Sequence, residues 1–173
     1  DVAVSSVNND YGKGLADVFA TAYEALGGTI TVMAGHEDDK ADYSADVAAL
    51  SAGGSATLVV IGYADTGGRG IVTASEDTGA FTDYVFPDGM ISDVTAGAVA
   101  DGSWGTIASP STDLAANWES VAAAGDVDGT GAYSAESYDA MALLILASQS
   151  AGSTDSAAIQ AAVLDVANAP GRL

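Results

Sequence analysis

The chain has 173 residues, of which 24 are acidic and only four are basic, so its net charge is −20. Phosphate contacts need clustered Lys and Arg, which excludes nucleic acid and an anionic membrane surface as partners. The chain has no cysteine, which excludes disulfides and thiolate metal sites, and no apolar run reaches the roughly 18 residues of a transmembrane helix.

Strand and helix patterns alternate along the first 125 residues. The first helix is predicted to begin with Asp10 as its N-cap, to bury Leu15, Val18, Phe19, Ala22 and Leu26, and to end at Gly27-Gly28. Further helices are predicted at Ser44 to Leu50, at Thr66 to Ser75 and around Leu114 to Ala122. The predicted strands are Val2 to Val7, Thr29 to Met33, Thr57 to Ile61, Tyr84 to Phe86 and Trp104 to Ala108.

This alternation predicts an α/β fold with a parallel, doubly wound sheet of about five strands and helices on both faces. The Gly- and Asp-rich stretch from Gly125 to Gly131 interrupts the pattern. Two helices follow, Ala135 to Ser148 and Ser156 to Asn168, and form a C-terminal pair. The first of them is apolar on nearly all sides, so we expect it to be buried.

Polar and aromatic residues follow three of the strands. In open α/β sheets ligands bind at the carboxyl ends of the strands, which makes Tyr11, Tyr63 and Asp88 candidate ligand-binding residues. Tyrosine offers an apolar face with a hydroxyl, and aspartate can pair with an ammonium group. The alternative interpretation is that both tyrosines only pack the loops and that Asp88 is a turn residue before Gly89.

Several segments resemble one family when taken in order. They are Asn8-Asn-Asp-Tyr-Gly-Lys-Gly14, Lys40-Ala-Asp-Tyr-Ser44, Val59-Val-Ile-Gly-Tyr63, Phe86-Pro-Asp-Gly-Met90 and Tyr133-Ser-Ala-Glu-Ser-Tyr-Asp-Ala140. Together they resemble the periplasmic solute-binding proteins of branched-chain amino acid (leucine/isoleucine/valine) ABC transporters, which have the type I periplasmic binding fold.

The resemblance implies a domain organisation. Residues 1–125 correspond to the second, C-terminal lobe, residues 126–132 to a linker, and residues 133–173 to helices that belong to a first lobe, most of which lies outside this chain. The opening directly on strand-like Val2 leads us to expect a mature or processed piece of a longer protein.

The resemblance also implies a function. Asp88 matches the acid that holds the ligand's α-ammonium, and Tyr11 and Tyr63 match aromatic residues that close over the ligand. The leucine-type proteins carry Glu where this chain has Asp88, so amides, urea and aromatic acids remain possible ligands.

We therefore expect the periplasmic substrate-binding component of an ABC transporter, with no enzymatic activity and no cofactor. It would present a small amino acid or amide to a permease, and its C-terminal helices could mediate self-association. An amino-acid or amide sensor domain of the same fold is the alternative. A nucleotide-using enzyme is disfavoured, because the loop after the first strand is acidic where a phosphate site needs backbone N–H groups and Gly.

Two acidic clusters resemble metal sites and are interpreted otherwise. We expect His36-Glu-Asp-Asp39 to form a solvated loop, since it contains the only histidine and adjacent acids cannot all face one ion. Asp126, Asp128 and Glu136 lack the spacing of a calcium loop, which indicates an Asp-Gly turn and no metal site.

Overall fold

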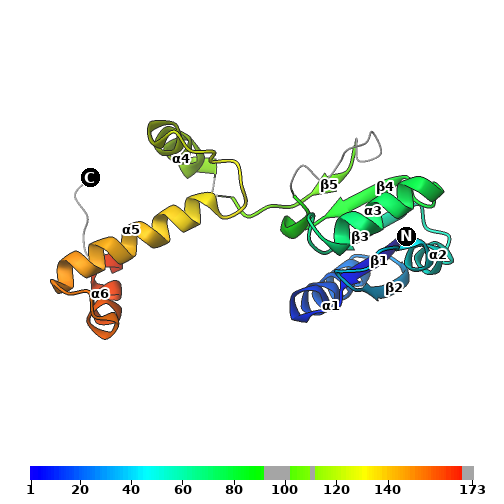
Figure 1. Cartoon of the computed structure of the whole chain (residues 1–173), viewed down its shortest axis with the longest axis horizontal. Coiled ribbons are helices and arrows are strands. Elements are labelled where there is room, and N and C mark those ends of the chain that lie inside the picture. The colour runs from blue at the N-terminus through cyan, green and yellow to red at the C-terminus, as the bar shows by residue number, and fades with distance from the viewer. Residues whose placement is uncertain (92–101, 110–111, 169–173) are drawn as a thin grey trace. The chain divides into compact units, whose positions relative to one another are not determined.

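The computed structural model describes residues 1–91, 102–109 and 112–168, and these form two compact units (Figure 1). The first unit spans Asp1–Ile107 and the second spans Ala108–Leu173. The boundary falls before the helix predicted around Leu114 to Ala122, which the sequence pattern groups with residues 1–125; the assignment of these parts to two lobes stays a prediction. None of the described helices is both long and apolar enough to cross a membrane.

The first unit is an α/β layer structure, as predicted. Its five strands are all parallel and lie in the order β2-β1-β3-β4-β5. The elements in chain order are β1 (Val2–Val7), α1 (Asp10–Ala25), β2 (Ile30–His36), α2 (Ser44–Ser51), β3 (Thr57–Ile61), α3 (Gly67–Thr78), β4 (Asp83–Phe86), the 3₁₀ turn η1 (Asp88–Met90) and β5 (Trp104–Gly105).

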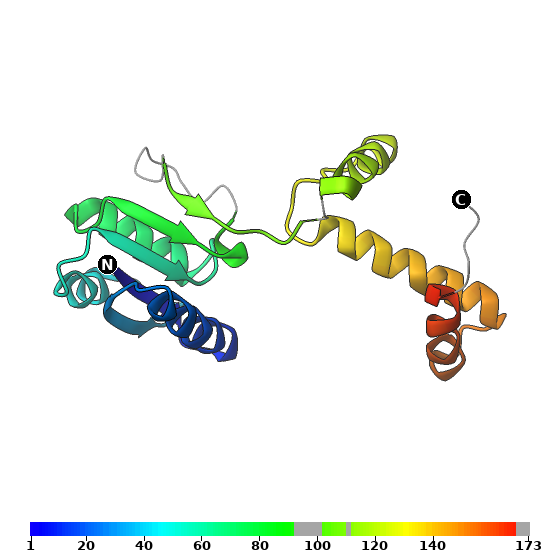
Figure 2. The ribbon, with the colours of Figure 1, turned by 180° about the vertical axis from the view of Figure 1, so that it is seen from behind.

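Helices cover both faces of this sheet, with α1 on one face and α2 and α3 on the other (Figures 1 and 2). Successive strand residues point to opposite faces, so β3 contributes to two separate cores. Leu58 and Val60 join the core beneath α2 and α3, whereas Val59 and Ile61 join the core beneath α1. This two-sided burial explains why β3 reads as an uninterrupted apolar run.

Helix α1 differs from its prediction at its start and in the side that it buries. Asn9, not Asp10, is the N-cap, and its side-chain oxygen accepts a hydrogen bond of 2.9 Å from the backbone N–H of Gly12. Val18 and Leu26 were expected to be buried but are 67% and 88% exposed. The side that packs on the sheet carries Tyr11, Leu15, Phe19 and Tyr23 together with Ala16.

The second unit contains α4 (Thr112–Gly125), α5 (Ser134–Ala151) and α6 (Ser156–Asn168). The indole N–H of Trp118 donates a hydrogen bond of 2.9 Å to the carbonyl of Gly129, and its ring lies 5.8 Å from that of Tyr138. Helix α5 ends at Gly152, whose positive φ of 60° suits glycine.

The burial expected for α5 is not found among the described residues. Its buried positions are Ala135 and Ala147, while most of its large apolar side chains are exposed, including Met141, Leu144, Ile145 and Leu146. Self-association through these helices stays a prediction.

Candidate functional site

The three predicted site residues lie in loops that follow neighbouring strands. Strands β1, β3 and β4 are adjacent in the sheet and parallel, so the loops after them meet at the same edge. Tyr11 lies in the first turn of α1, Tyr63 follows β3, and Asp88 begins η1. All three side chains are half-buried.

The first turn of α1 is held tightly against the end of β1, and this fixes the position of Tyr11. A Cβ at Gly12 would lie 2.0 Å from the carbonyl oxygen of Val7, so only glycine allows this approach. The side-chain oxygen of Asn9, the N-cap, accepts a hydrogen bond from the backbone N–H of Gly12. Tyr11 therefore projects from a well-defined helix start.

The loops after β3 and β4 are joined through their backbones. The N–H of Ala64 donates a hydrogen bond of 3.0 Å to the carbonyl of Gly89. A Cβ at Gly89 would lie 2.5 Å from the carbonyl oxygen of Gly62. These contacts place Tyr63 and Asp88 next to each other.

The side chains of the three residues meet directly. The Tyr11 hydroxyl donates a hydrogen bond of 3.1 Å to Oδ1 of Asp88, and the Tyr11 and Tyr63 rings stack with centroids 5.3 Å apart and planes 21° apart. Burial, helped by the hydrogen bond to Asp88 and its negative charge, raises the pKa of Tyr11 to about 12. The phenol is therefore a neutral donor that orients the carboxylate at any physiological pH.

This arrangement places a hydrogen-bonded carboxylate beside two aromatic rings, at the edge where such sheets bind ligands. The Asp88 carboxylate can attract an ammonium group, while the two tyrosine rings offer apolar contact area. The predicted juxtaposition of Tyr11, Tyr63 and Asp88 is present, and their role in ligand binding stays a prediction.

His36 was expected in a solvated loop, and this expectation is wrong. It is the last residue of β2 and is 2% exposed, with Nδ1 2.8 Å from Oγ of Ser5. The sequence held a signal for this, because Val32, Ala34 and His36 alternate along the strand, and Val32 and Ala34 pack on the core beneath α2 and α3. The predicted strand, Thr29 to Met33, ends too early, because β2 continues to His36.

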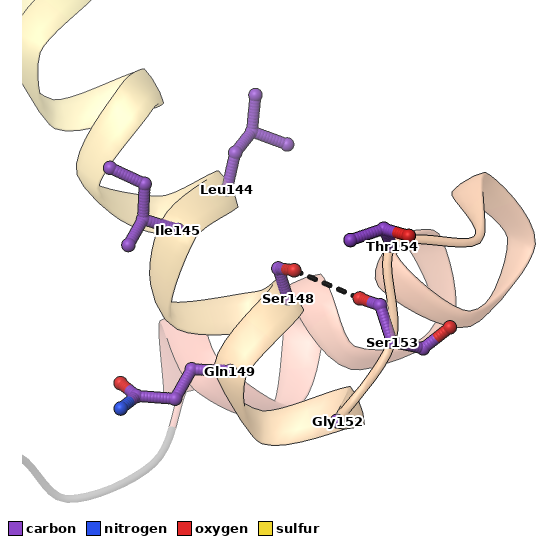
Figure 3. A pocket seen from close by; sticks show the side chains of 7 residues that line it. All are labelled: Leu144, Ile145, Ser148, Gln149, Gly152, Ser153 and Thr154. Atoms are coloured by element: carbon purple, nitrogen blue, oxygen red, sulfur yellow. Dashed lines mark hydrogen bonds between the residues drawn. The ribbon is translucent and has the colours of Figure 1, made fainter.

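Two surface hollows are lined by residues other than the three predicted site residues. One, of about 660 Å³, lies along α2 and α3 and combines aspartates such as Asp38, Asp65 and Asp77 with Lys40 and Arg69. The described residues contain no group of three His, Asp or Glu side chains able to hold a metal ion. The other, of about 880 Å³, lies at the turn between α5 and α6, where the Ser148 hydroxyl donates to the carbonyl of Ser153 (Figure 3). It is open and its lining has no ionisable side chain, so it offers nothing to hold a charged ligand.

Comparisons with known proteins identify the fold. No protein-family model matches the sequence, and no curated protein matches it. Solved structures do match, and those described below are type 1 periplasmic binding proteins or binding proteins of amino acid transporters.

A type 1 periplasmic binding protein from Bordetella pertussis Tohama I superposes with a TM-score of 0.76 at 19% identity, over 94% of this chain and 49% of its own. The branched-chain amino acid transporter substrate-binding protein LivJ from Streptococcus pneumoniae, solved with isoleucine, gives a TM-score of 0.69 at 20% identity, over 94% and 47% of the two chains. The leucine-binding protein LivK from Thermotoga maritima gives 0.68 at 20% identity, over 94% and 48%.

The chain therefore has the fold found in type 1 periplasmic binding proteins, and the resemblance noted from its sequence is confirmed at the level of the fold. It spans about half the length of these neighbours.

Proposed function

We propose that this chain supplies one lobe of a periplasmic substrate-binding protein that captures a small hydrophobic amino acid, or a related amide, for an ABC transporter. The observation that carries the proposal is the group formed by Tyr11, Tyr63 and Asp88 at the carboxyl edge of the sheet. The similarity in fold to binding proteins of amino acid transporters supports it.

The proposed mechanism is capture without chemistry. The carboxylate of Asp88, oriented by the Tyr11 hydroxyl, pairs with the ligand's ammonium group, and the two tyrosine rings contact its apolar part. A second lobe supplies the remaining contacts, and the two lobes close on the ligand by hinge motion. The closed form is then recognised by the membrane permease.

The test is a calorimetric titration of the full gene product that carries these 173 residues. The ligands are L-leucine, L-isoleucine, L-valine, L-phenylalanine, urea and a short amide. We expect an amino acid to bind, and Asp88→Asn to cost about 2 kcal/mol or more, which is about thirtyfold in affinity, because the ammonium loses its buried partner.

Asp83→Asn is the matched control, because Asp83 is an exposed acid at the opposite end of β4. It removes the same charge and should leave the affinity within a factor of about two. Equal effects of the two substitutions would mean that general electrostatics, rather than Asp88, attracts the ligand. If urea or the amide binds and none of the amino acids does, the ligand is not an amino acid.

A further inference from the structure

The single histidine of the chain is buried against the segment that carries Tyr63 of the proposed ligand site. His36 ends β2, and its ring nitrogen Nδ1 faces Oγ of Ser5, which is itself buried on β1. The other ring nitrogen, Nε2, is buried and meets no hydrogen-bond partner among the described residues. Such a ring is accommodated as a neutral imidazole, whose second nitrogen has no charge to satisfy.

Glycines of residues 62–69, the loop after β3 together with the first residues of α3, pack against this ring. A Cβ at Gly62 would lie 3.1 Å from Nε2, and a Cβ at Gly67 would lie 3.0 Å from Cδ2. Both distances are too short for comfortable contact, so the glycines let the backbone rest on the imidazole. Tyr63 belongs to this same segment.

The contact continues from the ring to the ligand site. A Cβ at Gly68 would lie 2.7 Å from the carbonyl oxygen of Tyr63 and 2.3 Å from Sδ of Met90, the last residue of η1. The His36 ring therefore packs against the glycine segment, and the glycine segment packs against the turn that bears Asp88. A displacement of the ring toward Gly62 therefore meets the backbone next to Tyr63.

We propose that His36, in its uncharged form, is a positioning residue for Tyr63, so that the ligand site is fully assembled only while this imidazole is neutral. The inference rests on the proposed function, because it concerns the same site. Protonation gives the ring a second N–H and a charge, which must find an acceptor or water where Gly62 now packs. The ring then moves or hydrates, and the Tyr63 segment moves with it.

The ionisable groups around His36 act in opposite directions. Burial lowers the pKa of His36, while the carboxylates of Asp38, Asp46 and Glu37 act to raise it and Lys40 acts to lower it. The segment packed on the ring also carries Asp65 and Arg69, which line the adjacent surface hollow. The net direction is downward, so the folded chain keeps the ring neutral at neutral pH.

The sign of the pH dependence follows from this direction. The unfolded chain binds the proton at the ordinary histidine pKa of about 6.5, whereas the folded chain resists it to a lower pH. The assembled site is thus fully stable above about pH 6.5 and loses stability as the pH falls through this value toward the folded-state pKa.

The first test is an NMR titration of the chain, in which the only histidine gives an unambiguous ring signal. We expect His36 to titrate below its ordinary pKa and the Tyr63 ring signals to change with the same midpoint. The ring of Tyr84, buried at the other end of β4, serves as the internal reference and should not follow. Tyr63 signals that stay constant while His36 titrates would overturn the proposal.

His36→Asn keeps a polar group near the position of Nδ1, facing Ser5, and cannot titrate. In this variant the Tyr63 signals should no longer change between about pH 5 and pH 7, and a transition that persists would contradict the proposal. The wild-type titration decides the question even where this variant does not fold.

A calorimetric titration of the full gene product with L-leucine, at about pH 7.5 and at about one pH unit below the His36 midpoint found by NMR, separates the two proposals. Affinity should fall by up to about tenfold per pH unit below the His36 midpoint in the wild type and stay level in His36→Asn. Affinity that is independent of pH in the wild type would overturn the positioning role. No binding at either pH, with Tyr63 still following His36 by NMR, would instead remove the proposed ligand and retain the positioning role.

Discussion

Gly12 is the position at which a single methyl group should displace part of the proposed ligand site from the sheet. In Gly12→Ala the new Cβ would lie 2.0 Å from the carbonyl oxygen of Val7 and 2.7 Å from its Cγ1. Both groups belong to Val7, which is buried at the end of β1 and paired with His36 of β2, so neither can yield easily. The start of α1 must move outward, and Tyr11 moves with it.

The size of the effect is the balance of two terms. Replacing glycine by alanine within a helix raises the free energy of unfolding by about 0.5–1 kcal/mol. Forcing a methyl group into a closely packed position costs about 1–3 kcal/mol. Gly14→Ala is the matched control, because Gly14 lies in the same helix and a Cβ there meets nothing within 4 Å. We expect Gly14→Ala to stabilise by about 0.5–1 kcal/mol and Gly12→Ala to be about 1–3 kcal/mol less stable than that control, because only Gly12→Ala carries the cost of the close contact.

The assay is urea unfolding of the three proteins followed by far-ultraviolet circular dichroism, with the near-ultraviolet signal reporting on the tyrosines. Gly12→Ala should unfold at a lower urea concentration and lose part of the Tyr11–Tyr63 signal, whereas Gly14→Ala should keep both. A Gly12→Ala protein as stable as Gly14→Ala, with an unchanged tyrosine signal, would refute the close approach of α1 to β1.

Three further predictions concern the first unit. The free energy of unfolding should fall between about pH 10 and pH 12, because the unfolded chain loses its tyrosine proton near 10 while the pKa of Tyr11 is raised to about 12. Urea unfolding at a series of pH values measures this fall, tyrosinate absorbance follows the ionisation of the tyrosines, and Tyr11→Phe should remove the part due to Tyr11. Ser75→Ala removes the hydroxyl that lies 2.7 Å from the buried Tyr84 hydroxyl, and urea unfolding should show a loss of about 1–3 kcal/mol. Adding Tyr84→Phe should recover part of this loss. Full additivity of the two substitutions would contradict the hydrogen bond. Gly89→Ala places a Cβ 2.5 Å from the carbonyl of Gly62 and should separate the loops after β3 and β4, which an unchanged near-ultraviolet spectrum would disprove.

The sequence predicted those parts of the fold that local pattern determines. The apolar runs of β1 and β3 match the observed strands residue for residue, because strands buried on both faces leave no ambiguity about their ends. The meeting of Tyr11, Tyr63 and Asp88 followed from topology alone, since parallel neighbouring strands bring their following loops to one edge.

The remaining features depend on tertiary geometry that local pattern does not contain. Asn9 and Asp10 are both good N-cap residues, and the residue at which β1 ends decides which of them caps the helix. Helix α1 carries two overlapping apolar stripes, and the position of the sheet selects the one with Leu15 and Tyr23 over the one with Val18. The burial of His36 likewise depends on glycines that are distant in sequence.

The most direct test of the central claim is a crystal structure of the full gene product with L-leucine or L-isoleucine bound. We expect the ligand nitrogen to lie about 2.7–3.2 Å from a carboxylate oxygen of Asp88, with the ligand against the rings of Tyr11 and Tyr63. A ligand bound away from this edge of the sheet, with the Tyr11–Asp88 pair untouched, would contradict it.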